Sequence, residues 1–177
     1  NTGKPVEVII EENYPHFIDL IPEIIDIQNI FKNYKQKNNL LDYDDLLVYL
    51  KGFLENSSPA VRSLLSSIKF VMVDEYQDTN KLQSDIVKGL TQQNNNIMVV
   101  GDDSQSIYSF RGANFKNIIE FPSLFKNVQI IKLEENYRSS QAILNLANHI
   151  NETAIEKYTK VLYTRKTSGE LPLIIAA

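Results

Sequence analysis

The sequence predicts an α/β protein with a parallel sheet and flanking helices, preceded by a helical N-terminal segment. From residue 70 onward, short apolar runs typical of strands alternate with longer stretches whose apolar residues recur at helical spacing. Strands that alternate with helices in this way form parallel sheets with crossover helices. Acidic residues follow two of these strands directly, at the end where ligands bind in open α/β sheets.

Local signals place the individual elements. Pro22 favours a helix that begins near it, and Asp42 has the side chain of an N-cap for the next helix. Residues 6–10 read as a short strand or an extended segment. The runs at 70–73 and 97–100 predict buried strands. The other expected elements are a strand at 128–133, a strand start at 173–175, helices at 60–67 and 81–90, and a helix or turn at 117–125. A further helix is expected at 139–150, with Ile143, Leu144, Leu146, Ala147 and Ile150 facing inward.

Composition restricts the classes of site and partner. The 177 residues include 43% hydrophobic and 23% charged side chains, which is ordinary for a globular protein. The net charge of -4 argues against a uniformly basic surface but is compatible with a local basic groove for nucleic acid. Cys is absent and the two His residues lie far apart, so thiolate and histidine metal sites are not expected. No apolar run reaches the roughly 18 residues that span a bilayer, and we expect a cytoplasmic protein.

The first motif is the acidic pair Asp74 and Glu75 at the carboxyl end of the strand at 70–73. Carboxylates at a buried strand end are costly unless a cation lies nearby. Magnesium, held by a carboxylate and by substrate phosphates, is the obvious candidate. Asp74 would hold the metal and Glu75 would orient and deprotonate a water. The alternative is a strand that ends in a solvated acidic turn.

The second motif, at residues 99–113, combines a glycine, a glutamine, two aromatics and an arginine. Gly101 permits a tight turn after the strand, and Gln105 is an uncharged donor and acceptor just beyond it. Tyr108, Phe110 and Arg111 suit base stacking together with a phosphate contact. The alternative is that both aromatic residues belong to the core beneath a loop.

The third motif, at residues 133–140, places Tyr137 and Arg138 between a strand and a helix cap. Arginine is suited to bidentate phosphate recognition and to charge neutralisation in phosphoryl transfer. Tyr137 beside it would cover a purine face. The alternative is a surface arginine paired with Glu134 or Glu135.

Taken together, the motifs resemble those of the superfamily 1 DNA helicases of the UvrD/Rep/PcrA type. The stretches VDEYQDTN, GDDSQSIYSFRGA and LEENYRSSQAIL occur in the family's order, and LLDYDDLL resembles the segment before them. The resemblance covers roughly residues 40 to 165. It implies a partial RecA-like P-loop NTPase domain in an enzyme that couples ATP hydrolysis to 3′-to-5′ translocation on single-stranded DNA and to duplex unwinding.

The resemblance also implies roles for residues at the nucleotide. Asp74 and Glu75 correspond to the pair that coordinates Mg2+ and activates water. Gln105 corresponds to the sensor of the ATP γ-phosphate, and Arg138 to the arginine finger. Tyr137 would stack on adenine, and Gln77 would help link nucleotide state to neighbouring loops.

A second set of implied roles concerns DNA. Tyr108, Phe110 and Arg111 correspond to the family's contacts with single-stranded DNA. Two positions depart from the pattern, since Ser104 stands where the family often has Asp and Phe110 where it often has Trp. Phe keeps a stacking face of smaller area, so we expect weaker DNA contact rather than its loss.

The resemblance divides the chain into three parts. Residues 1–40 would end a helical insert, 41–135 would complete the first RecA-like ATPase domain, and 136–177 would begin the second. No GxxxxGK[ST] motif occurs in the sequence, so we expect an internal piece that is inactive alone. Its sheet would be completed by another copy or left with exposed edges.

Two alternatives to this assignment remain. One is the helicase subunit of a RecB- or AddA-like helicase–nuclease, and the other is a non-enzymatic DNA-binding scaffold with helicase architecture. Expected partners are single-stranded and partly duplex DNA, and DNA repair or replication proteins.

Overall fold

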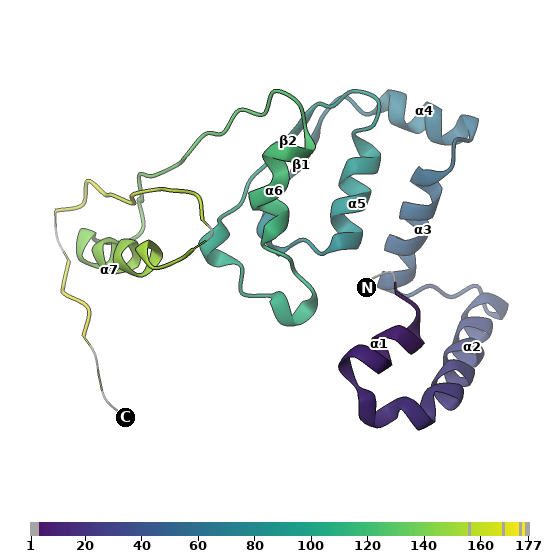
Figure 1. The fold of residues 1–177 in the computed structure, drawn as a ribbon. Coiled ribbons are helices and arrows are strands. Elements are labelled where there is room, and N and C mark those ends of the chain that lie inside the picture. Colours follow the sequence, from purple (N-terminus) through teal and green to yellow (C-terminus); the bar gives the residue numbers. More distant parts are fainter. Residues whose placement is uncertain (1–3, 156, 168, 174, 176–177) are drawn as a thin grey trace.

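A computed structural model describes residues 4–155, 157–167, 169–173 and 175 (Figure 1). The chain is mixed helix and strand, with helices dominant. In chain order, with η for 3₁₀ helices, the elements are α1 (Val6–Asn13), η1 (Pro15–Leu20), α2 (Ile21–Lys37), α3 (Tyr43–Glu55), α4 (Pro59–Ser67), β1 (Val71–Val73), η2 (Tyr76–Asp78), α5 (Lys81–Leu90), β2 (Ile97–Val99), η3 (Asp103–Gln105), η4 (Ser109–Arg111), α6 (Lys116–Leu124) and α7 (Gln141–Glu152).

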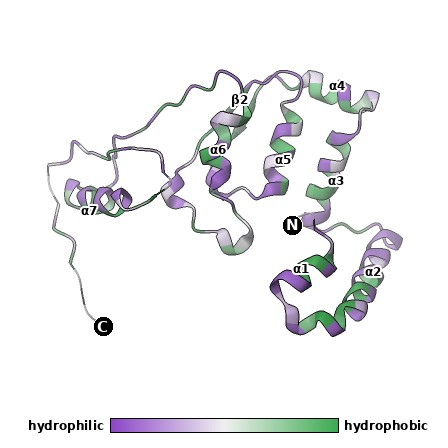
Figure 2. Ribbon diagram, viewed as in Figure 1, coloured by the Kyte–Doolittle hydropathy of each residue, from purple (hydrophilic) through white to green (hydrophobic). Residues whose placement is uncertain are grey.

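The N-terminal region is helical, as expected, but residues 6–10 lie in α1 and not in a strand. Pro22 lies in the first turn of α2, where its missing N–H costs no helical hydrogen bond. Lys35 near the end of α2 reaches the start of α3, because its Nζ donates to Asp42 at 2.8 Å and to Asp45 at 2.6 Å. Figure 2 shows green, hydrophobic stretches on α2, although no residue of this helix is buried.

The predicted N-cap at Asp42 is confirmed. Its side chain accepts the N–H of Asp45 at 2.8 Å, and the Asp45 side chain accepts the N–H of Asp42 at 3.0 Å, which forms a capping box. The helix α3 packs against α4 and α5 through buried residues, namely Leu54, Val61, Leu65, Leu82 and Ile86. This cluster fixes the end of the helical region against the strand–helix–strand unit that follows.

The strands β1 and β2 form a parallel two-stranded sheet with Met72 opposite Met98, and α5 is the crossover helix between them. Residues on one face of the sheet, including Val71, pack into a core with α5 and α6. The other face is open: Met72 is 71% and Met98 54% exposed. The prediction of two fully buried strands is therefore wrong for this face, while the parallel pairing is confirmed.

Three other expectations fail in the C-terminal half. Residues 128–133 are extended but form no strand among the described residues, and Leu133 is 82% exposed. In α7 only Leu144 is buried, whereas the other large apolar side chains of the helix are exposed (Ile143, Leu146 and Ile150). Residues 173 and 175 lie in no strand, and residue 174 is outside the described part.

The long extended segment before α7 separates this helix from the sheet, and α7 stands apart from β1 and β2 in Figure 1. A parallel bridge between Glu135 and Tyr163 joins the segments before and after α7. Within the described ranges, no helix combines the length and apolar character needed to cross a membrane.

Candidate functional site

The site begins where β1 ends, at Asp74 and Glu75. Both residues are exposed, and Oδ1 of Asp74 accepts the N–H of Glu75 at 2.9 Å. Glu75 has a left-handed backbone, with φ 51° and ψ 41°, which is uncommon for a residue with a side chain. Such strain persists only where surrounding contacts hold it.

Gln77 is the side chain that holds this turn. It is 1% exposed, and its Nε2 donates to Oε2 of Glu75 at 2.7 Å. Its Oε1 accepts the N–H of Asp102 at 3.0 Å, and its carbonyl accepts the hydroxyl of Ser106 at 3.2 Å. The first two predicted motifs are therefore joined by one buried amide.

Gly101 makes this contact possible for a reason that differs from the predicted one. A Cβ at this position would lie 2.5 Å from Oε1 of Gln77 and 2.7 Å from Cδ1 of Ile118. The backbone φ of Gly101 is not in the left-handed region. The glycine is thus required for space at the Gln77 contact and not for a special turn.

Asp102 organises the turn that carries Gln105. Its Oδ2 accepts from Nε2 of Gln105 at 2.8 Å, and its Oδ1 accepts the N–H of Ser104 at 3.0 Å. Gln105 is exposed, at the end of η3. Asp102, which the sequence did not single out, therefore connects Gln77 and its partner Glu75 to Gln105, through its backbone N–H on one side and its carboxylate on the other.

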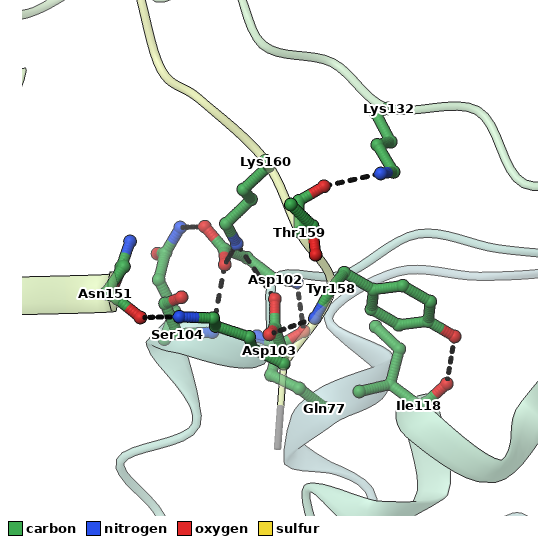
Figure 3. Close-up of polar contacts among 12 residues, drawn as sticks. Gln77, Asp102, Asp103, Ser104, Ile118, Lys132, Asn151, Tyr158, Thr159 and Lys160 are labelled. Atoms are coloured by element: carbon green, nitrogen blue, oxygen red, sulfur yellow. Dashed lines mark hydrogen bonds and ion pairs between the residues drawn. The ribbon is translucent and has the colours of Figure 1, made fainter. Parts of the chain in front are cut away.

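Lys160 completes this cluster from the far end of the chain (Figure 3). Its Nζ donates to Oδ1 of Asp103 at 2.9 Å and also to Oδ1 of Asp102. Burial opposes ionisation of Asp102, but hydrogen bonds from Lys160 and Gln105 outweigh it, so the pKa of Asp102 lies below its ordinary value. Burial likewise opposes the charge of Lys160, but the bonds to both carboxylates raise its pKa. No sequence signal marked Lys160, because 57 residues separate it from Asp103.

The aromatic residues of the second motif are exposed and do not belong to the core. Phe110 is 75% and Tyr108 39% exposed, and their ring centroids lie 6.0 Å apart. The alternative that both are core residues is therefore wrong. Arg111 lies at the end of η4, and its side chain is outside the described part of the structure.

Tyr137 and Arg138 lie at the other end of the molecule, just before α7. Tyr137 is 77% exposed, and the backbone N–H of Arg138 donates to Oδ1 of Asn136 at 2.9 Å. Arg138 lines an open groove together with Arg165 and Lys166. The structure does not bring this groove to Asp74 and Glu75, because α7 and its approach stand apart from the sheet (Figure 1).

The acidic neighbours of Arg138 have other partners. Oε1 of Glu135 pairs with Nε of Arg165 at 2.9 Å, and Oε1 of Glu134 accepts the N–H of Val161 at 2.9 Å. Neither glutamate pairs with Arg138, so the alternative of a surface arginine paired with Glu134 or Glu135 is wrong. The guanidinium is left accessible in the groove.

The donor set at β1 fits a hard divalent cation. Among the described residues, no group of three or more His, Cys, Asp or Glu side chains is arranged to hold a metal. Mg2+ is commonly held by one or two carboxylates, waters and substrate phosphates. Asp74 and Glu75 provide exposed carboxylates of this kind.

Comparison with known proteins agrees with the motif order. The model of the UvrD/REP helicase N-terminal domain matches residues 15–126. The chain is 42% identical over 141 residues to ATP-dependent DNA helicase Rep of Buchnera aphidicola subsp. Acyrthosiphon pisum, covering 80% of this chain and 22% of the relative. It is 37% identical over 147 residues to ATP-dependent DNA helicase PcrA of Staphylococcus aureus strain Mu50, covering 81% of this chain and 20% of the relative. The chain thus spans about a fifth of the length of these relatives.

Proposed function

The chain belongs to the UvrD/REP helicase family, and from this premise we propose that it is part of an ATP-dependent 3′-to-5′ DNA helicase. The full-length protein would couple ATP hydrolysis to translocation on single-stranded DNA and to duplex unwinding. The observation that carries this proposal is the hydrogen-bonded path from Glu75 through Gln77 and Asp102 to Gln105. The path ties two of the three helicase motifs into one unit.

Under this proposal, residues of the path act at the nucleotide. Asp74 and Glu75 hold Mg2+, and the buried Gln77 fixes the Glu75 carboxylate through the 2.7 Å bond. Glu75 orients water and accepts its proton. Gln105, on an exposed turn, reaches the γ-phosphate. Mg2+ supplies neutralisation of phosphate charge when it is bound.

The other assigned residues act on the base and on DNA. Tyr137 stacks on adenine and Arg138 neutralises the transferring phosphoryl group, and both side chains are exposed as these roles require. Their separation from Asp74 means that catalysis needs α7 and the sheet to approach one another. Tyr108, Phe110 and Arg111 contact single-stranded DNA, and the exposed rings of the first two support stacking.

The proposed division of the chain follows the same assignment. Residues 1–40 end a helical insert, 41–135 complete a first RecA-like domain with a P-loop fold, and 136–177 begin a second. The separation of α7 from the sheet supports a boundary near residue 136 (Figure 1). We also propose that residues 1–177 alone turn over no ATP, because the sequence holds no GxxxxGK[ST] motif to cradle the phosphates.

The test is ATPase activity stimulated by single-stranded DNA, measured on the full-length protein and on residues 1–177. We expect turnover by the full-length protein, its loss on removal of Mg2+ or in Glu75→Gln, and none from the shorter chain. A folded but silent full-length protein would favour the scaffold alternative. Magnesium-dependent turnover by the shorter chain that Glu75→Gln abolishes would contradict the predicted inactivity.

A further inference from the structure

Lys160 is joined to the acidic turn after β1 by a continuous path of hydrogen bonds. It binds Asp102, whose N–H donates to Gln77, and Gln77 donates in turn to Glu75. A branch of the path leads from Asp102 to Gln105. Lys160 therefore contacts the same carboxylate that positions Gln105.

The Lys160 ammonium and the Asp103 carboxylate are largely withdrawn from water. Its side chain is 14% exposed, and that of Asp103 is 5% exposed. A charge withdrawn from water to this degree is costly unless it is paired. Asp103 also binds the segment at 157–163, which carries Lys160, because its Oδ2 accepts the N–H of Tyr158 at 3.0 Å. The Tyr158 hydroxyl donates to the carbonyl of Ile118 at 2.9 Å, which fixes the same segment against α6 (Figure 3).

The segment that carries Lys160 is also bound to α7. The N–H of Leu162 donates to Oδ1 of Asn148 at 2.9 Å, and Nδ2 of Asn148 donates to the carbonyl of Leu162 at 2.9 Å. This two-way pair joins the segment at 157–163 to α7. Lys160 lies two residues before Leu162, so the same segment connects its ammonium to α7.

Asp102 lies between Lys160 and Gln105 and binds both side chains. One carboxylate oxygen of Asp102 binds Lys160 and the other binds Gln105. When the Lys160 bond is lost, Oδ1 of Asp102 is still held by the N–H of Ser104, but the carboxylate has one restraint fewer on its terminal torsion, which is soft for Asp. The acceptor of the Gln105 amide is then held less firmly.

We propose that Lys160 is a positioning residue that couples α7 to Gln105 through the Asp102 carboxylate. The proposal rests on the function proposed above, in which α7 approaches the nucleotide at the acidic turn. It deepens that function by assigning how the position of α7 is communicated to the γ-phosphate contact. Lys160 acts through Asp102 and touches no reacting atom.

The test compares Lys160→Met and Lys160→Arg with the matched control Lys157→Met in the full-length protein. Lys157 lies in the same segment, but its Nζ binds the carbonyls of Asn151 and Glu152, at 2.6 and 2.8 Å, and within the described ranges it pairs with no carboxylate. Hydrogen exchange of the amides at 102–105 measures the contact without any activity. The kcat and KM for ATP, with single-stranded DNA present, measure its effect on turnover.

We expect Lys160→Met to raise exchange at 102–105 and to lower kcat by about 5-fold or more with little change in KM. Lys160→Arg, which keeps the charge, should restore both readouts, and Lys157→Met should alter neither. Unchanged exchange in Lys160→Met, or equal effects of Lys157→Met, would overturn the proposal. If Lys160→Met raises exchange at 102–105 but neither the unmodified protein nor any variant hydrolyses ATP, the proposed function is refuted. The catalytic part of this coupling is then refuted with it.

Discussion

The side-chain oxygen of Gln77 accepts the backbone N–H of Asp102 at 3.0 Å, across 25 residues of sequence. The amide nitrogen of the same side chain donates to Glu75 at 2.7 Å. Because Gln77 is 1% exposed, its amide makes these bonds out of contact with water. The two acidic turns at the sheet end are therefore held in register by one side chain.

Gln77→Ala should lower the free energy of unfolding by about 1–3 kcal/mol, because it removes both hydrogen bonds of a buried side chain. Urea unfolding of the 177-residue chain measures the change. The control is Gln92→Ala, at an exposed turn position, where we expect a change within about 0.5 kcal/mol. Equal stabilities of the two variants would show that the bridge adds nothing.

Gly101→Ala and Gly52→Ala should have opposite effects. At Gly101 the new methyl group would lie 2.5 Å from Oε1 of Gln77, and overpacking of this kind costs about 1–3 kcal/mol. At Gly52, inside α3, a Cβ meets nothing within 4 Å, and the gain in helix propensity should stabilise by about 0.5–1 kcal/mol. Thermal unfolding of both variants decides the sign, and a stable Gly101→Ala would refute the close approach.

The stability contributed by the Lys160 cluster should depend on pH in a defined window. The lowered pKa of Asp102 gives a contribution that is present above the ordinary Asp value of 3.8 and is lost as pH falls through the folded value below it. The raised pKa of Lys160 gives a contribution that is present below 10.5 and is lost as pH rises through the folded value above it.

The difference in the free energy of unfolding between the unmodified chain and Lys160→Met should therefore be largest between pH 3.8 and pH 10.5. The difference should shrink toward strong acid and toward strong base. Urea midpoints at a series of pH values measure it, with Lys157→Met as the reference substitution. A difference that stays constant across the whole range would mean that packing, and not charge, accounts for the contribution of Lys160.

Arg138→Ala in the full-length protein should reduce ATP turnover on the order of 10³-fold and leave single-stranded DNA affinity nearly unchanged. The accessible guanidinium in the groove beside α7 is the structural reason. Steady-state ATPase and fluorescence anisotropy of labelled DNA measure the two effects. Arg62→Ala, an exposed position in α4, controls for loss of one positive charge.

Phe110→Ala is the complementary variant. Under the proposed function, its exposed ring stacks on a base, a contact worth about 1–3 kcal/mol, so DNA affinity should fall and turnover without DNA should not. If Arg138→Ala weakened DNA binding as strongly as Phe110→Ala, the separate roles of these residues would be refuted.

Local sequence signals were sufficient where a few neighbouring residues determine structure. The helix α5 was predicted with its observed bounds, and Asp42 was predicted as an N-cap, because caps and apolar spacing act within one or two turns. Propensity alone misled at 128–133, where a strand-like run lacks a strand to pair with among the described residues.

The sequence motifs supplied candidate site residues but not the hydrogen bonds that connect them. Glu75, Gln77 and Gln105 were identified from motif positions, and the structure links all three. The bonds of Asp102 and Lys160 depend on tertiary placement, which no local pattern encodes. Tertiary placement also explains why the sequence did not reveal the need for glycine at position 101. The atoms that a Cβ would meet there belong to Gln77 and Ile118, which lie in other elements.

The sequence separations within the Lys160 cluster also bear on the order of folding. Gln77 and Asp102 are 25 residues apart, whereas Lys160 and Asp102 are 58 apart. Closing the longer loop costs more chain entropy, at about 0.6 kcal/mol for each doubling of length. Its closure becomes favourable only once the turn at Asp102 and Asp103, to which Lys160 binds, has formed. The sheet and its two acidic turns should therefore form first, and the segment at 157–163 should dock last and detach first on unfolding.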